Sequence, residues 1–153
     1  MKKSEAKRML KKLREENKKY TYKYLLAEGI LLLYSGEMPK ANTSLRKALS
    51  LNPIPECHYF LGITYLNLQS FKKAYVHFSK ATVKKGWVNP LLGCYVCLMA
   101  LRKREEAMEF LKRAMSLDPI KSSNLLKDIV GKNNPLGILF KELESTSKIS
   151  HGK

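Results

Sequence analysis

Two cysteines and two histidines are the residues of this sequence whose types could support chemistry at one site. Cys94 and Cys97 form a C-x-x-C pair, a spacing used by redox proteins and by structural zinc sites. A redox pair of that kind needs a strand–helix–strand context, which is missing here, and a zinc site needs two further ligands. His58 and His77 do not have the spacing of a zinc finger. We therefore predict no metal and no cofactor, and cysteines that pack as small apolar side chains.

Groups for other kinds of catalysis are also missing from the sequence. It contains no Gly-rich phosphate loop and no G-x-S-x-G nucleophile motif. Acidic residues are scattered singly or paired on helix faces that should be exposed, as at Glu105 and Glu106. Because no acid–base pair is assembled, we predict that the chain has no catalytic residues and is not an enzyme.

The elements that must position these residues repeat at a fixed step. Small residues recur every 33 residues in two series, Ala41, Ala74 and Ala107, and Ala48, Ala81 and Ala114. Between them, in the same register, stand Leu45, Phe78 and Leu111. A period of this size indicates an array of stacked helical units. We predict three helical hairpins at 22–54, 55–87 and 88–120, and, because the glycine position of the third is taken by Tyr95, a wider or rotated helix pair there.

The two ends of the chain flank this array. Residues 1–21 are strongly basic, and apolar residues at helical spacing predict an amphipathic helix. We expect it to cap the first hairpin, with a membrane surface or a partner as alternative contacts. Residues 121–145 predict a C-terminal cap of one or two helices, with Ser122 and Ser123 as helix N-caps, or else a segment that folds back into the groove. Residues 146–153 predict a flexible tail.

The pattern of small and large residues resembles the tetratricopeptide repeat. The second unit carries it most clearly, and its matching residues are Leu61, Gly62, Tyr65, Ala74, Phe78 and Ala81. Pro53 and Pro119 close the first and third units as in that family, and Gly86 takes the place of the proline in the second. The resemblance implies an all-α, right-handed solenoid of three hairpins with a helix at each end. It also implies a concave groove lined by the first helix of each hairpin.

The groove implied by this register is mostly apolar. Its predicted partner-binding residues are Leu26, Ile30, Leu33, Tyr34, Tyr59, Ile63, Leu66, Asn89, Leu92, Val96 and Met99. Contiguous apolar surface of this kind usually marks a binding site, although the chain's own ends could also fill it. The positions of the carboxylate clamp found in chaperone-binding members are Leu26, Ile30, Phe60, Asn89 and Gly93. None of these carries a charge, so we exclude that form of recognition.

The opposite side of the array is predicted to be basic, in line with a net charge of +16. Lys40, Lys47, Lys73, His77, Lys80, Lys84 and Arg113 would form a basic ridge along it. Such a ridge is either a solvated helix face or a surface for an acidic or nucleic-acid partner.

These patterns favour a small protein-binding module without a small-molecule substrate. We predict an adaptor or chaperone that holds a partner peptide or helix in the apolar groove, similar in size and layout to bacterial type III secretion chaperones. The alternative is a basic assembly component that docks on RNA or a ribonucleoprotein. Three cysteines and no long apolar run favour a cytoplasmic location without a membrane span.

Overall fold

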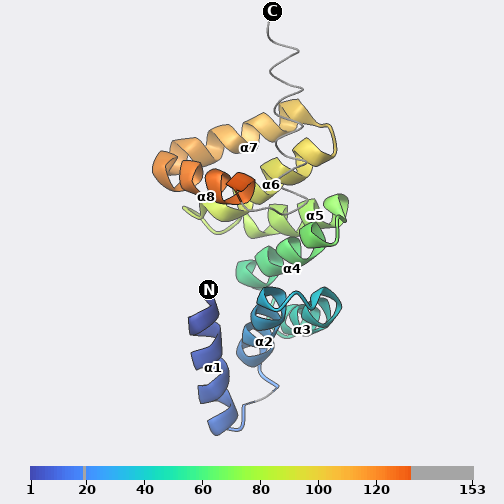
Figure 1. Cartoon of the computed structure of the whole chain (residues 1–153), viewed down its shortest axis with the longest axis vertical. Coiled ribbons are helices and arrows are strands. Elements are labelled where there is room, and N and C mark those ends of the chain that lie inside the picture. Colours follow the sequence, from blue (N-terminus) through green and yellow to red (C-terminus); the bar gives the residue numbers. More distant parts are fainter. Residues whose placement is uncertain (19, 132–153) are drawn as a thin grey trace, which may run out of the picture.

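The computed structural model describes residues 1–18 and 20–131, which form an all-α stack. Within these residues there are eight helices and no strand: α1 (Lys3–Glu15), α2 (Tyr22–Tyr34), α3 (Met38–Leu51), α4 (Pro55–Asn67), α5 (Phe71–Ala81), α6 (Val88–Ala100), α7 (Arg104–Leu117) and α8 (Pro119–Gly131). They follow one another along the long axis of the molecule, from α1 at one end to α7 and α8 at the other (Figure 1). The predicted fold class, a helical solenoid, is confirmed.

Six of the helices pack as hairpins, α2 with α3, α4 with α5 and α6 with α7. The repeated alanines explain why these pairs form. All six are completely buried: Ala41, Ala48, Ala74, Ala81, Ala107 and Ala114. Small side chains let two helices approach closely, while Leu45 and Phe78, also buried, fill the space beside them.

Each hairpin turns through one residue with left-handed backbone geometry, and these residues share the repeat register. They are Gly36, Gln69 and Arg102, with φ of 78°, 58° and 63°. In each turn the amide of the following residue donates to a carbonyl five residues earlier: Glu37 to Leu32, Ser70 to Tyr65 and Lys103 to Leu98. This is the hydrogen bond that closes a Schellman motif, so all three hairpins end their first helix in the same way.

The boundary between α7 and α8 differs from the prediction. Asp118 caps α8, since its carboxylate accepts a hydrogen bond from the amide of Lys121 at 2.9 Å. Ser122 is therefore not the cap. It is buried one turn into the helix, and its hydroxyl donates to the carbonyl of Ala114 at 2.9 Å. This bond attaches α8 to α7.

Phe78 lies where two neighbouring hairpins meet. A Cβ atom added to Gly62 on α4 would stand 2.7 Å from its ring, and one added to Gly93 on α6 would stand 2.6 Å from it. Gly93 thus brings α6 directly against α5 of the preceding hairpin. The wider or rotated third helix pair expected from Tyr95 concerns α6 and α7 and stays a prediction.

Both ends of the described chain cover the array. Ala6, Leu10 and Leu13 are buried in one cluster with Ala27 and Ile30, so α1 packs on α2. α8 packs on α6 and α7. The rest of the predicted C-terminal cap, residues 132–145, and the whole predicted tail, residues 146–153, lie outside the described residues. No helix in the described part is long and apolar enough to cross a bilayer.

Candidate functional site

A hollow lined mainly by the first helices of the first two hairpins brings together five of the predicted groove residues. It has a volume of about 240 Å³ and is lined by Ile30, Leu33, Tyr34, Met38, Tyr59, Phe60, Ile63 and Asn67. The first three of these lie on α2, Met38 begins α3, and the rest lie on α4. The lining is apolar except for the Tyr hydroxyls and the Asn67 amide.

The helical register explains how α2 and α4 form this hollow. Ile30, Leu33 and Tyr34 occur at spacings of three and four residues and therefore share one face of α2. Ile30 is fully buried, whereas Tyr34 is 54% exposed at the last position of the helix. The hollow thus has a buried apolar base and an accessible aromatic edge. Met38 was not predicted as a lining residue, because it belongs to the second helix of its hairpin.

Tyr59 is held firmly on one side of the hollow by other aromatic rings. Its ring centre lies 5.2 Å from that of Phe60, 5.8 Å from that of Phe78 and 4.7 Å from that of Trp87. Burial raises the pKa of its hydroxyl, which accepts a hydrogen bond from the Asn89 amide at 3.3 Å. Tyr59 is therefore a fixed part of the hollow and remains neutral at physiological pH.

Asn89 carries an unused hydrogen-bonding atom beside this cluster. Its amide nitrogen donates to Tyr59, but its side-chain oxygen is buried and has no partner among the described residues. A buried acceptor without a partner costs free energy, about 1–3 kcal/mol.

The other predicted groove residues do not line this hollow. Leu26, Leu92, Val96 and Met99 are buried, and Leu66 is half-buried between the second and third hairpins. The reason on α6 is the packing of α8. Leu126 packs against the clusters that contain Leu92, Val96 and Met99. Among the predicted groove residues, those that line an accessible hollow are thus on α2 and α4.

The predicted basic ridge is made of exposed cations, several of which already have partners. Lys40 pairs with Glu37 at 3.1 Å, and Lys84 pairs with Glu56. Lys73 and Arg113 lie over the rings of Tyr65 and Phe110, while Lys47 and Lys80 are exposed. These interactions are typical of a solvated basic helix face.

His77, the remaining ridge residue, belongs to a histidine pair that sequence reasoning missed. Nδ1 of His77 lies 3.1 Å from Nδ1 of His58, and the Tyr65 ring stacks on His77 at 5.4 Å. Burial, His58 and the cations Lys80 and Arg46 lower the pKa of His77 to about 4. His77 is therefore neutral near pH 7 and adds no charge to the ridge. Only the packing of α4 on α5 could reveal this pair.

The three cysteines are all buried, as free thiols. Burial raises the pKa of Cys57 to about 11 and that of Cys94 to about 12, and it raises the pKa of Cys97 further. All three are protonated at physiological pH. No group of three or more His, Cys, Asp or Glu side chains comes together for a metal ion in the part of the chain that the structure describes.

Comparison with known proteins supports the tetratricopeptide resemblance in one part of the chain. A family model described as tetratricopeptide repeat matches residues 96–121. No curated protein matches the chain significantly. Two of the similar solved structures are titled as crystal structures of MamA. One is 18% identical and has a TM-score of 0.64, with 95% of this chain and 89% of that chain covered. The other is 21% identical and has a TM-score of 0.61, with 68% of this chain and 58% of that chain covered.

A third similar structure, titled "MamA MSR-1 C2", is 20% identical and has a TM-score of 0.60. The similarity covers 84% of this chain and 79% of that chain. At these identities the three structures establish a shared fold. Neither they nor the matching family supports the predicted nucleic-acid alternative.

Proposed function

We propose that this chain, a tetratricopeptide-like helical array, is a protein-interaction module that holds an apolar segment of a partner protein in the hollow between α2 and α4. The observation that carries this proposal is the hollow itself. It combines a buried apolar base, an accessible Tyr34 edge and a fixed Tyr59 wall. Its volume of about 240 Å³ has room for one or two large apolar side chains but not for a folded domain.

The polar groups around the hollow favour a peptide segment as the ligand. A bound segment presents backbone amides as well as side chains, and these need polar partners on the lining. Asn67, exposed at the end of α4, offers its amide oxygen on this lining, since its amide nitrogen donates to the carbonyl of Ile63 at 2.8 Å. Apolar anchors combined with a few fixed polar groups are the usual chemistry of peptide grooves.

This arrangement would serve an adaptor or a chaperone that keeps a partner segment bound, and the cytoplasm would be a suitable place for that role. The apolar anchors would supply most of the affinity, because burying one large apolar side chain contributes about 1.5–3 kcal/mol. Buried aromatic residues are also the commonest hot spots of protein interfaces.

Site-specific photo-crosslinking tests the proposal. Tyr34 is replaced by p-benzoyl-phenylalanine in the full chain, and adducts formed in cells are compared with those from the same replacement at Val83. Val83 is also exposed, at 72%, but lies outside the hollow. We expect one dominant adduct at position 34 that disappears when Ile63→Asp is added. Equal adducts at both positions, or an adduct that survives Ile63→Asp, would show that the hollow is not the site.

A further inference from the structure

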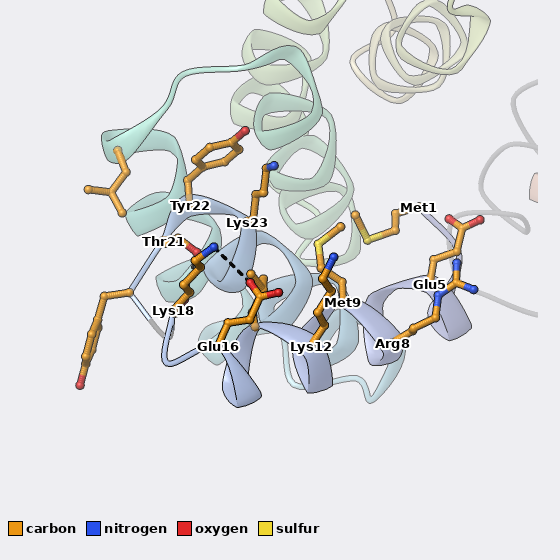
Figure 2. Close-up of a pocket in the computed structure, with 13 residues that line it drawn as sticks. Met1, Glu5, Arg8, Met9, Lys12, Glu16, Lys18, Thr21, Tyr22 and Lys23 are labelled. Atoms are coloured by element: carbon orange, nitrogen blue, oxygen red, sulfur yellow. Dashed lines mark hydrogen bonds and ion pairs between the residues drawn. The ribbon is translucent and has the colours of Figure 1, made fainter.

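We propose a second docking site, at the N-terminal end of the array, for an acidic partner segment that carries apolar side chains. The site is an open hollow of about 1160 Å³ between α1, the start of α2 and the end of α3. It is separate from the hollow between α2 and α4, with which it shares no lining residue. The lining includes Met9 and Lys12 of α1, Lys23 of α2 and Leu51 of α3, some of which Figure 2 labels.

One face of α1 forms one side of this hollow. Glu5, Arg8, Met9, Lys12 and Glu16 recur at helical spacing and all line it. The neighbouring face of α1 packs on α2 through Ala6, Leu10 and Leu13. Since α1 is anchored by that buried face, the hollow is a fixed feature of the fold.

The hollow carries an excess of positive charge, because its carboxylates have partners and, within the described residues, several of its cations do not. Its carboxylates are already engaged, because Glu16 pairs with Lys18 at 3.1 Å and Glu5 accepts a hydrogen bond from the Lys2 amide at 3.1 Å (Figure 2 shows the Glu16 pair). Arg8, Lys12 and Lys23 form no ion pair within the described chain.

The beginning of α2 adds further positive potential. Helix N-termini carry partial positive charge, and the first residues of α2 line the hollow. A bound segment therefore gains most from carboxylates placed against Arg8, Lys12 and Lys23.

The apolar lining distinguishes a peptide from a simple anion. Met1, Met9, Leu13 and Leu51 line the hollow between and opposite the cations. Leu51 is 58% exposed, although the other large apolar side chains of its helix are buried or half-buried. Acidic side chains for the cations and apolar side chains for these contacts occur together in an acidic, amphipathic protein segment.

A membrane surface is a poorer match to the same residues. To bind a bilayer, α1 would have to present its apolar face, but Ala6, Leu10 and Leu13 are buried against α2. The remaining apolar side chains lie in a concave surface, which a flat bilayer cannot enter. The structure therefore favours a protein segment.

Fluorescence anisotropy with the full chain tests this site. The probe is a short fluorescein-labelled peptide in which Glu alternates with Leu, and the matched probe has Ser in place of Leu. We expect the double variant Arg8→Gln, Lys12→Gln to bind the Leu probe roughly three- to tenfold more weakly, the range of a few exposed ion pairs. The control variant Lys72→Gln, Lys127→Gln removes the same charge from exposed positions outside the hollow and should bind as the original does.

Three outcomes would overturn the proposal. Equal weakening by the control variant would mean that the net charge of +16 acts without a site. Equal affinity for the Ser probe would mean that the apolar lining has no role. Binding to phosphatidylserine vesicles that Arg8→Gln, Lys12→Gln abolishes, without binding of the Leu probe, would assign the surface to a membrane. Tyr34→Gln, which alters only the other hollow, should leave binding of the Leu probe unchanged, so the two proposals can fail independently.

Discussion

Gly62 on α4 and Gly93 on α6 lie against the same aromatic ring, that of Phe78 on α5. A Cβ atom at either glycine would stand 2.6–2.7 Å from ring carbons that are completely buried. The two glycines belong to different hairpins, so this one ring connects the second hairpin to the third. Its environment leads to the first prediction.

Gly93→Ala should destabilise the protein, although alanine usually favours a helix over glycine. The new methyl group has no space, and overpacking of this kind costs typically about 1–3 kcal/mol. Urea unfolding followed by circular dichroism measures the loss. Phe78→Leu should restore part of it in the double variant, because the smaller side chain leaves room for the methyl group. Two independent, additive losses would contradict the proposed clash.

Much of this fold was predictable from sequence because it depends on residue size at a fixed step. The buried alanines, the three hairpins and Tyr34 and Ile63 in the inner hollow all follow from one register. The contact between Gly93 and Phe78 does not, because it joins neighbouring hairpins and depends on how far one is rotated against the next. The His58–His77 pair was missed because it depends on how α4 and α5 pack within one hairpin, and the burial of Leu92 was missed because it depends on where α8 packs.

The hairpin turns provide a prediction about backbone strain. Gln69 and Arg102 adopt the left-handed conformation that Gly36 adopts in the first hairpin. That conformation costs a non-glycine residue about 1 kcal/mol or more in the folded state. Glycine removes this strain, but its greater conformational freedom stabilises the unfolded chain and offsets part of the gain. Gln69→Gly and Arg102→Gly should therefore raise the free energy of unfolding by roughly 0.5 kcal/mol, whereas Gly36→Ala should lower it. Thermal melts of the three variants check this, and a loss on both glycine substitutions would contradict it.

The histidine pair predicts a dependence of stability on pH. His77 has a pKa near 4 in the folded chain and about 6.5 when unfolded, and the pKa of His58 is also lowered. As the pH falls from about 6.5 to 4, the unfolded chain binds protons that the folded chain does not, so stability should fall through this window. The partly exposed rings limit the effect to the order of 1 kcal/mol. His77→Gln should show a shallower slope in urea unfolding over this range, and an unchanged slope would contradict the prediction.

The cysteines should resist modification while the chain is folded. Cys57, Cys94 and Cys97 are all fully buried, and burial keeps their thiols protonated. We expect no reaction with DTNB under native conditions and three equivalents in denaturant. Rapid reaction of one thiol in the folded chain would mean that α4 or α6 opens locally.

The hydroxyl of Ser122 should hold α8 in place. It is buried, and its hydrogen bond to the Ala114 carbonyl joins α8 to α7. Ser122→Ala leaves that carbonyl without this partner and should cost about 1 kcal/mol. Hydrogen exchange should increase in α8 more than in α2 to α5, and Ser123→Ala, at a half-buried neighbouring position, serves as the control.

The burial of α6 has a consequence for how the array could grow or be divided. Leu92, Val96 and Met99 are closed off by packing that includes α8, whereas Tyr34 and Leu33 at the other end remain accessible. The accessible apolar surface therefore lies in the first two hairpins, although a helix covers each end of the array. A further repeat spliced in ahead of α2 would have to displace α1, and one spliced in after α7 would have to displace α8.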